Sequence, residues 1–393
     1  MIDAATWAAR LGGENFLAQA FTRSHHHSPG PGAFDALITW DDLNTILATH
    51  RLSPPRLRLA RGGEHVDVSK YATPVTNRRG STWHRLQPAA VQDQLADGTS
   101  LVLDSIEEIH PPIAAAAEAL ERFVRTPVQV NAYASWTAEQ GFGRHWDDHA
   151  VVVLQIAGAK RWLLYGPTRQ APGWRDMEFP EEPQGDPVTE IVLHEGDILY
   201  VPRGWWHEVT ADQGQPSLHL SFGLLPSTGA DFLGWVVDRL RGHLAVRQDV
   251  PRFAPAADQA AYVEALRKVL LTELDRPGIF SQWTQTVDAT HPGHARLSLP
   301  YVAAVPPDPG ITVRLTCPRA RLTDGEGTVT LAAAGTERDF AAPARPILDA
   351  LVTGEPVTLE ELAQRSGLPI GDVADLVSAL VKDQSAAIVG TAR

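Results

Sequence analysis

The sequence is poor in cysteine and in positive charge, and it has no long hydrophobic run. Its single cysteine, Cys317, excludes an internal disulfide and a metal cluster held by several thiolates. The longest strongly apolar uncharged run, 150–159, is too short to span a bilayer. The first residues show no charged segment followed by an apolar core, so we predict no signal peptide and expect a cytoplasmic protein with no membrane partner.

Negative charge dominates the chain. The 34 Lys and Arg residues stand against 47 Asp and Glu residues, which gives a formal net charge of −13. Such a chain has no bulk attraction for nucleic acids or anionic membranes. Its 393 residues, 44% of them hydrophobic and 21% charged, resemble an ordinary soluble protein with two or three domains.

Short apolar runs fill the middle of the chain. They are separated by turn residues such as Gly158, Pro167, Gly196 and Pro202. Many short strands at near-even spacing predict an antiparallel barrel or a double-sheet roll rather than alternating strands and helices. The predicted strands are 128–133, 150–156, 161–165, 189–193, 198–201 and 217–222.

The flanks of this region have different patterns. A helix is predicted at 113–124 and a helical stretch at about 228–275, whereas 301–340 returns to short strands. From Ala344 onward, three short helices and a strand give the outline of a winged helix. We therefore predict a catalytic domain at 1–226, a helical dimerisation region at 227–300 and a winged-helix domain at 301–393. The histidines 25–27 are predicted to lie in a solvated loop.

Two histidines and one aspartate form the strongest chemical signal. His145 and Asp147 are two residues apart, which on a strand places both side chains on one face. Pro202 and Gly204 predict a tight hairpin that presents His207 from a neighbouring strand. Two imidazoles and one carboxylate on one face of a metal leave positions open, an arrangement that suits non-haem Fe(II).

Other interpretations of these residues remain open. A lone His-x-Asp occurs by chance in many proteins, and His149, His194 and His219 compete as ligands. His149 is the best rival, because it lies two residues beyond Asp147. His219 alternates with two serines and faces the same roll, but a hydrogen-bonded core histidine fits that position equally well.

An Fe(II) site of this kind needs an anchor for a dicarboxylate cosubstrate. Lys160, one turn after the strand that follows His145, would pair with the distal carboxylate of 2-oxoglutarate if it is buried; otherwise it is a solvated charge. Asn131 and Tyr133 share one face of a strand and can donate hydrogen bonds to a carboxylate. Ordinary polar residues at the edge of a core would show the same spacing.

Taken together, these motifs resemble the Jumonji-C oxygenases of the cupin-4 group. The similarity begins at Asn131-Ala-Tyr133 and continues through His145-Trp-Asp147, Gly158-Ala-Lys160 and Gly204-Trp-Trp-His207. Within that group the chain is most similar to the ribosomal oxygenases, which hydroxylate a side chain of a large-subunit ribosomal protein. The resemblance implies a mainly β double-stranded β-helix (cupin or jelly-roll) core with helices, Fe(II) and 2-oxoglutarate dependence, and a homodimer.

Carried over by position, the resemblance assigns roles to residues. His145, Asp147 and His207 would be the iron ligands, Lys160 would bind 2-oxoglutarate with help from Tyr133, and Asn131 would line the pocket. The acidic residue with which bacterial members hold a substrate arginine has no clear match, because alanine occupies position 138. Tryptophans near the motifs would shield the site and line the groove, with a packing role favoured for Trp162; they are Trp136, Trp146, Trp162, Trp205 and Trp206.

Three functions compete at this stage. The first is a 2-oxoglutarate-dependent hydroxylase of a protein, most simply a ribosomal one, and the second is a peptide or natural-product hydroxylase with the same chemistry. The third is a metal-binding cupin without catalysis that carries a winged-helix interaction module. DNA binding is disfavoured, because residues 341–393 carry four cations and seven carboxylates and the last predicted helix lacks arginine.

Overall fold

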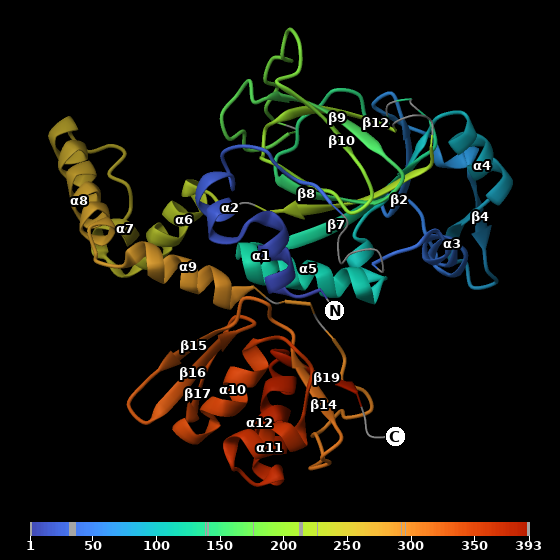
Figure 1. Cartoon of the computed structure of the whole chain (residues 1–393). Coiled ribbons are helices and arrows are strands. Elements are labelled where there is room, and N and C mark those ends of the chain that lie inside the picture. Colours follow the sequence, from blue (N-terminus) through green and yellow to red (C-terminus); the bar gives the residue numbers. More distant parts are fainter. Residues whose placement is uncertain are drawn as a thin grey trace. The chain divides into compact units, whose positions relative to one another are not determined.

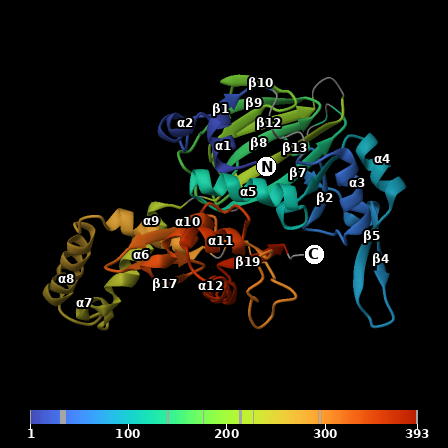
Figure 2. The same cartoon turned by 60° about the horizontal axis from the view of Figure 1, so that its bottom comes forward.

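The structure is a computed structural model that divides into two compact units, Met1–Pro226 and Ser227–Arg393. It describes residues 2–30, 37–137, 139, 141–175, 177–211, 215–225, 227–291, 293–294 and 296–390. Figures 1 and 2 show the elements of each unit. None of the described helices is both long and apolar enough to cross a membrane.

The first unit combines two antiparallel sheets with helices. The larger sheet has eight strands in the order β1-β11-β8-β13-β7-β6-β2-β3, and the smaller has three in the order β10-β9-β12. The strands of these sheets are β1 (His26–Ser28), β2 (Leu57–Arg61), β3 (Glu64–His65), β6 (Ser100–Leu103), β7 (Val128–Ser135), β8 (Ala150–Ala157), β9 (Lys160–Gly166), β10 (Thr189–Leu193), β11 (Ile198–Val201), β12 (Trp206–Ala211) and β13 (Ser217–Leu224).

The helices of the first unit and one hairpin complete it. The helices are α1 (Ala4–Leu11), α2 (Gly13–Gln19), α3 (Trp40–Thr49), α4 (Pro88–Ala96) and α5 (Pro111–Val124), and the hairpin is β4 (Ala72–Thr76) with β5 (Thr82–Leu86). The predicted helix at 113–124 is confirmed as α5, which begins with two prolines at positions where no backbone donor is needed.

Strand β8 explains the layering of this unit. Because side chains alternate along a strand, Val151 and Val153 face the small sheet, while Val152, Leu154 and Ile156 face the helices. Both faces are buried, and the strand therefore has an almost continuous apolar sequence that only Gln155 interrupts.

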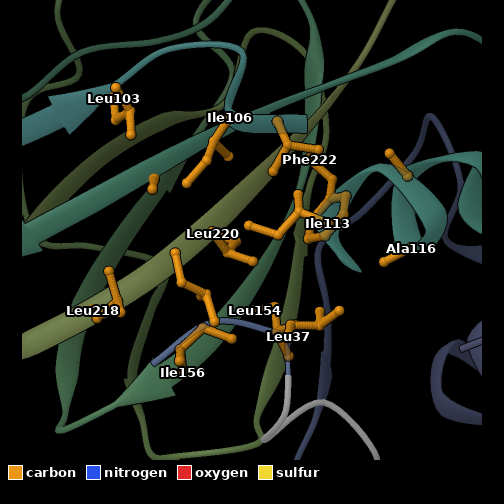
Figure 3. Close-up of a cluster of buried hydrophobic side chains, with 14 of the residues drawn as sticks. Leu37, Leu103, Ile106, Ile113, Ala116, Leu154, Ile156, Leu218, Leu220 and Phe222 are labelled. Carbon is orange, nitrogen blue, oxygen red and sulfur yellow. The ribbon is translucent and has the colours of Figure 1, made fainter. Parts of the chain in front are cut away.

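The core between the large sheet and the helices holds the unit together. Leu154 of β8 and Leu220 and Phe222 of β13 belong to the same cluster as Ile113 and Ala116 of α5 (Figure 3). Full burial of each large apolar side chain stabilises the fold by about 1.5–3 kcal/mol. The opposite face of the same strands is therefore left free to line the interior of the roll.

Two sequence-based expectations for this unit are wrong. His26 and His27 belong to edge strand β1, which pairs with β11, and His25 precedes it; all three histidines are half-buried, so they do not form a solvated loop. Strands β11 and β12 do not form a hairpin: β11 pairs with β8 in the large sheet, whereas β12 pairs with β9 in the small one. The turn at 202–205 instead carries the chain from one sheet to the other, which closes the roll.

The second unit contains a helical group followed by a mixed group. The helices of the first group are α6 (Gly229–Arg239), α7 (Leu244–Arg247), α8 (Ala256–Leu274) and α9 (Ile279–Thr290). The mixed group comprises β14 (Thr312–Leu315), β15 (Arg321–Asp324), β16 (Thr328–Ala333), β17 (Thr336–Ala341), α10 (Arg345–Val352), β18 (Val357–Thr358), α11 (Leu359–Ser366), α12 (Ile370–Lys382) and β19 (Ala386–Gly390).

The local signals of the mixed group are confirmed. Thr358 and Glu361 form a reciprocal capping box at the start of α11, and Gly367 ends that helix at a φ of 69°. Its three helices and two three-stranded sheets, β18-β14-β19 and β15-β16-β17, share one hydrophobic core.

Candidate metal and cosubstrate site

Three side chains predicted as metal ligands converge inside the roll. One ligand atom from each of His145, Asp147 and His207 lies within 4.8 Å of the other two. The two imidazole centroids are 4.3 Å apart, and His207 Nε2 lies 3.7 Å from Asp147 Oδ2. Among the described residues, only these three form such a group.

The backbone fixes the distance between the two histidines. The His145 amide donates to the His207 carbonyl at 3.0 Å, and the His207 amide donates to the His145 carbonyl at 2.7 Å. His145 makes this isolated bridge within an irregular segment, so His145 and Asp147 do not lie on a strand, and their two-residue spacing does not by itself place them on one face. The paired backbone nevertheless sets both rings side by side.

Each ring is also fixed in orientation. Nδ1 of His145 lies 2.9 Å from the carbonyl of Gly143, and Nδ1 of His207 lies 2.9 Å from the carbonyl of Trp205. A carbonyl only accepts, so each Nδ1 carries the proton and donates it. The lone pair of each imidazole is therefore on Nε2, which is the state a metal ion requires.

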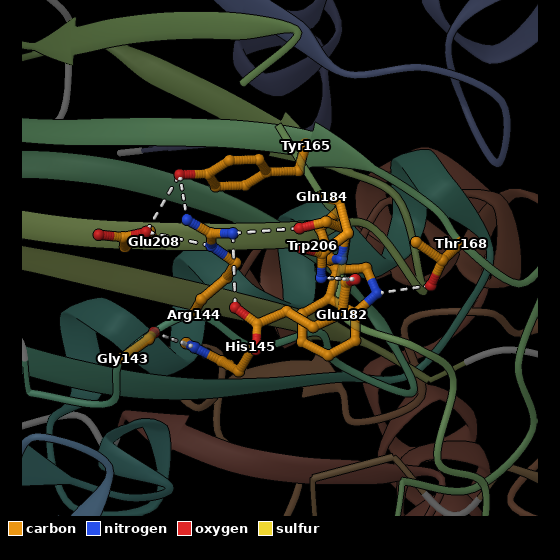
Figure 4. Close-up of polar contacts among 10 residues, drawn as sticks. Gly143, Arg144, His145, Tyr165, Thr168, Glu182, Gln184, Trp206 and Glu208 are labelled. Atoms are coloured by element: carbon orange, nitrogen blue, oxygen red, sulfur yellow. Dashed lines mark hydrogen bonds and ion pairs between the residues drawn. The ribbon is translucent and has the colours of Figure 1, made fainter. Parts of the chain in front are cut away.

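Behind the histidines, an ion pair ties their two segments together. Arg144 Nε donates to Glu208 Oε2 at 3.3 Å, and Arg144 Nη2 donates to the Tyr165 hydroxyl at 3.0 Å (Figure 4). The Tyr165 hydroxyl in turn donates to Glu208 Oε2 at 3.1 Å. Since Arg144 and Glu208 adjoin His145 and His207, this network resists separation of the two ligands.

The electrostatics favour an anionic Asp147 and a neutral His207. Burial alone would raise the pKa of the Asp147 carboxyl, but the positive charges that surrounding histidines and Arg175 can present outweigh it and lower that pKa to about 2. Burial, with a contribution from His145, lowers the pKa of His207 to about 4. At neutral pH Asp147 therefore offers a negative charge and His207 offers an imidazole lone pair.

A cavity of about 430 Å³ opens onto this group. Its wall includes Lys160 and Trp162 of β9, Asn131 and Tyr133 of β7, and His219 of β13. The residues of β7 and β13 face inward because their neighbours along each strand face the helices, whereas on β9 the buried Lys160 and Trp162 alternate with less buried residues.

Lys160 is a buried cation in this cavity. It is 5% exposed, its Nζ donates to Ser135 Oγ, and no carboxylate in the described part of the chain pairs with it. Burial lowers the pKa of its ammonium group to about 8. Because a buried charge is costly without a partner, this position suits an anionic ligand.

Asn131, Tyr133 and His219 surround the same space. The Asn131 side-chain oxygen accepts from the Ser105 amide at 3.1 Å, which orients that amide group. The Tyr133 ring stacks on His219 with centroids 4.9 Å apart, and burial raises the pKa of its hydroxyl to about 12. Burial, followed by the charge of Lys160, lowers the pKa of His219 well below its usual value.

The other candidates have different places. His149 lines the cavity but contacts Asp148 rather than joining the three convergent residues. His194 is exposed and does not line the cavity.

The tryptophans near the motifs also differ in position. Trp162 stacks on His207, with ring centroids 5.5 Å apart, whereas the other four tryptophans do not line the cavity. Position 138 lies outside the described residues.

Two residues that sequence reasoning missed reach the cavity. Arg175 Nη1 lies 3.1 Å from Asp147 Oδ1, although it comes from the long connection between β9 and β10. Arg58 also lines the cavity and pairs with Asp104, with an Nη2–Oδ1 distance of 2.8 Å. Neither arginine lies in a recognisable sequence motif. Only the spacing of charged residues along the chain could have indicated that these two side chains reach the cavity.

Comparison with known proteins agrees with this geometry. Residues 106–232 match the family model of the JmjC domain. This segment therefore has the sequence features of a JmjC domain. The matched segment includes both histidines, Asp147 and Lys160, and it runs from just before α5 into α6.

Curated relatives of the JmjC domain include oxygenases. The protein is 39% identical over 102 residues to the bifunctional lysine-specific demethylase and histidyl-hydroxylase NO66 of Drosophila persimilis, over 26% of this chain and 15% of that protein. It is 30% identical over 194 residues to ribosomal oxygenase 1 of Gallus gallus, over 49% of this chain and 31% of that protein. The matches therefore span less than a third of these two relatives.

Solved structures extend the similarity of fold beyond the JmjC domain. The ribosomal oxygenase YcfD of Escherichia coli, in complex with cobalt and 2-oxoglutarate, matches with a TM-score of 0.61 over 96% of this chain and 98% of that one, at 20% identity. Another structure of YcfD gives a TM-score of 0.62 at 19% identity. The JmjC cupin-type fold is thus confirmed.

Proposed function

We propose that the protein is an Fe(II)- and 2-oxoglutarate-dependent oxygenase that hydroxylates a side chain of a ribosomal protein of the large subunit. The observation that carries the proposal is the buried, unpaired Lys160 in the same cavity as His145, Asp147 and His207. A cation without a carboxylate partner beside three metal-type donors is the combination that a dicarboxylate cosubstrate and a ferrous ion require.

Each residue then has a defined task. His145, Asp147 and His207 would hold the ion through two Nε2 atoms and one carboxylate oxygen, and Lys160 would bind the distal carboxylate of 2-oxoglutarate. Tyr133 would donate a hydrogen bond to that carboxylate, while Asn131 lines the wall. A bound ferrous ion would supply the activation of dioxygen that is coupled to decarboxylation of 2-oxoglutarate. Trp162 covers His207 and limits access of water on that side.

Relatives support the substrate class. A Gallus gallus relative is described as a ribosomal oxygenase, and the Drosophila persimilis relative as a histidyl-hydroxylase. Such a substrate is consistent with a cytoplasmic enzyme. We further propose that the helices of 227–300 form a homodimer interface and that 301–393 is a winged-helix module for protein contact rather than nucleic acid binding.

The test is iron-dependent release of succinate from 2-oxoglutarate. We expect turnover by the wild type and its loss, by at least about a hundredfold, in His145→Ala, since a metal ligand is removed. His194→Ala is the matched control, because that histidine is exposed and away from the cavity. Equal turnover by wild type and His145→Ala would refute the proposed metal site. No turnover by the wild type would refute the oxygenase and favour a metal-binding cupin without catalysis.

The substrate is tested by mass spectrometry. We expect one ribosomal protein to gain the mass of one oxygen in cells that contain the enzyme and to lack it in deletion cells. An oxygen gain found only in small peptides or natural products would instead establish the alternative hydroxylase.

A further inference from the structure

The connection between β9 and β10 concentrates the exposed apolar side chains of the first unit. We call its described residues, 167–175 and 177–188, the rim loop. Trp174, Met177 and Phe179 are 64%, 66% and 85% exposed, and Val188 is 63% exposed. In the described part of the first unit, Leu225 is the only other exposed large apolar residue. Isolated exposed residues are ordinary, but their grouping on one connection marks an interaction surface.

Contacts with the segment 204–206 and within the loop itself hold the rim loop in place. Thr168 Oγ1 accepts from Trp206 Nε1 at 2.9 Å, and a Cβ on Gly204 would lie only 2.4 Å from Pro172. Glu178 accepts from the Gly173 amide at 2.7 Å. These contacts fix the base of the loop while its apolar side chains point outward, so a partner would meet a preorganised surface.

The rim loop also borders the metal and cosubstrate cavity. Arg175 lines that cavity and contacts Asp147. From the other side, Arg144 donates to the Pro183 carbonyl at 3.2 Å and pairs with Glu182 at 3.4 Å (Figure 4). A polypeptide that places one side chain in the cavity would therefore lie against this loop.

The negative charge of the rim loop determines which kind of partner can bind there. Its two cations are already paired, Arg169 with Glu178 and Arg175 with Asp147. Glu181 and Asp186 are exposed, and no cation in the described ranges forms an ion pair with either of them. The surface thus offers apolar side chains next to uncompensated negative charge, which excludes nucleic acid and favours cations.

We propose that the rim loop is the docking surface for the protein substrate and that it takes a polypeptide segment in which Lys or Arg alternates with large apolar residues. The proposal rests on the proposed function, because it supplies the substrate class of that same site. Trp174, Met177 and Phe179 would bury the apolar residues, and Glu181 and Asp186 would attract the cations.

Binding of defined peptide pools tests this inference. Fluorescent pools would combine Lys and Arg with Leu, Phe and Met, the same cations with Ser and Gln, or Glu and Asp with the same apolar residues. We expect the cationic apolar pool to bind the wild type at least about fivefold more tightly than either other pool, with an advantage over the anionic pool that shrinks at high salt. Equal binding of the three pools would overturn the proposal.

Matched variants locate the binding surface. Phe179→Ser, and the double variant Glu181→Lys/Asp186→Lys, should each weaken binding of the cationic apolar pool by about fivefold or more. Val302→Ser and Glu326→Lys are the controls, since both positions are exposed on the second unit. Loop variants that bind this pool as tightly as the wild type would contradict the inference, as would a change in their sedimentation mass, which would mean that the loop covers a second copy.

A separate readout distinguishes failure of the docking surface from failure of the proposed function. Succinate release without peptide should be unchanged in Phe179→Ser and in the double variant, because neither change touches the cavity. Normal succinate release without any preference among the pools would refute only the docking surface. Selective peptide binding without iron-dependent succinate release would refute only the oxygenase.

Discussion

Lys160 gives the site a pH dependence that can be predicted from its burial. Its pKa is lowered to about 8, so it is cationic at pH 7 and largely neutral at pH 9. Binding of a dicarboxylate needs the cationic form, and the affinity for 2-oxoglutarate should therefore fall as pH rises through 8, becoming about tenfold weaker at pH 9 than at pH 7. Calorimetry with Mn(II) in place of iron measures this affinity without turnover.

Lys160→Arg provides the control for this prediction. A guanidinium remains charged across the whole range, so its affinity for 2-oxoglutarate should be nearly constant between pH 7 and pH 9. His207, with a pKa of about 4, is neutral throughout and adds no slope. Parallel slopes for wild type and Lys160→Arg would show that another group sets the pH dependence.

At the same scale, the sequence predicted which three candidate metal ligands come together better than it predicted their surroundings. His145, Asp147 and His207 were predictable because spacing and turn residues are local signals, and the structure brings them together. The contact of Arg175 with Asp147 was not predictable, because it depends on how a long connection folds back over the roll. Burial of Lys160 likewise follows from the closure of two sheets and not from its neighbours in sequence.

At the scale of the element, the turn between β8 and β9 positions Lys160 at the start of β9. Gly158 in this turn has a φ of 67°, and a Cβ there would lie 2.1 Å from the Pro216 carbonyl oxygen. Gly158→Ala should therefore destabilise the first unit by about 3 kcal/mol, from backbone strain and a clash together. It should also weaken binding of 2-oxoglutarate, because Lys160 follows two residues later. Urea unfolding and calorimetry measure the two effects.

Gly166→Ala, at the other end of β9, separates the effect of backbone strain from the effect of the clash with Pro216. Gly166 has a φ of 74°, but a Cβ there would meet nothing within 4 Å. Its substitution should cost only the backbone strain, about 1 kcal/mol, and leave the cosubstrate affinity unchanged. Equal losses of stability in both variants would show that the Pro216 carbonyl moves aside at little cost.

The helices and strands also show which structural features the sequence patterns could predict and which they could not. Strand β8 and helix α5 were predictable because their apolar spacing is complete within each segment. The pairing of β11 and β12 with different sheets was not, since a Pro-Gly turn between two short strands also fits a hairpin. Strand β1 was missed because His26 is half-buried through its pairing with β11 and its contact with Phe16, both of which come from distant parts of the chain.

At the scale of the whole molecule, helix α8 of the second unit and the turn before it expose apolar surface that a monomer leaves in water. Helix α8 has no buried residue, and Phe253 and Val263 are 93% and 61% exposed. Burying such side chains against a second copy is favourable, and two-fold dimers are the commonest solution. We therefore expect sedimentation at about twice the monomer mass of 42.7 kDa.

Substitutions on this helical surface should shift that equilibrium. The double variant Phe253→Ser/Val263→Glu should weaken association by at least about tenfold, because it removes apolar area and places a charge in the interface. Phe179→Ser is the control, since Phe179, at 85% exposed, is nearly as exposed as Phe253 but lies on the rim loop of the first unit. A wild type that sediments as a monomer would refute the interface. A mass shift caused by Phe179→Ser alone would move the contact to the rim loop and would simultaneously contradict the docking of substrate there.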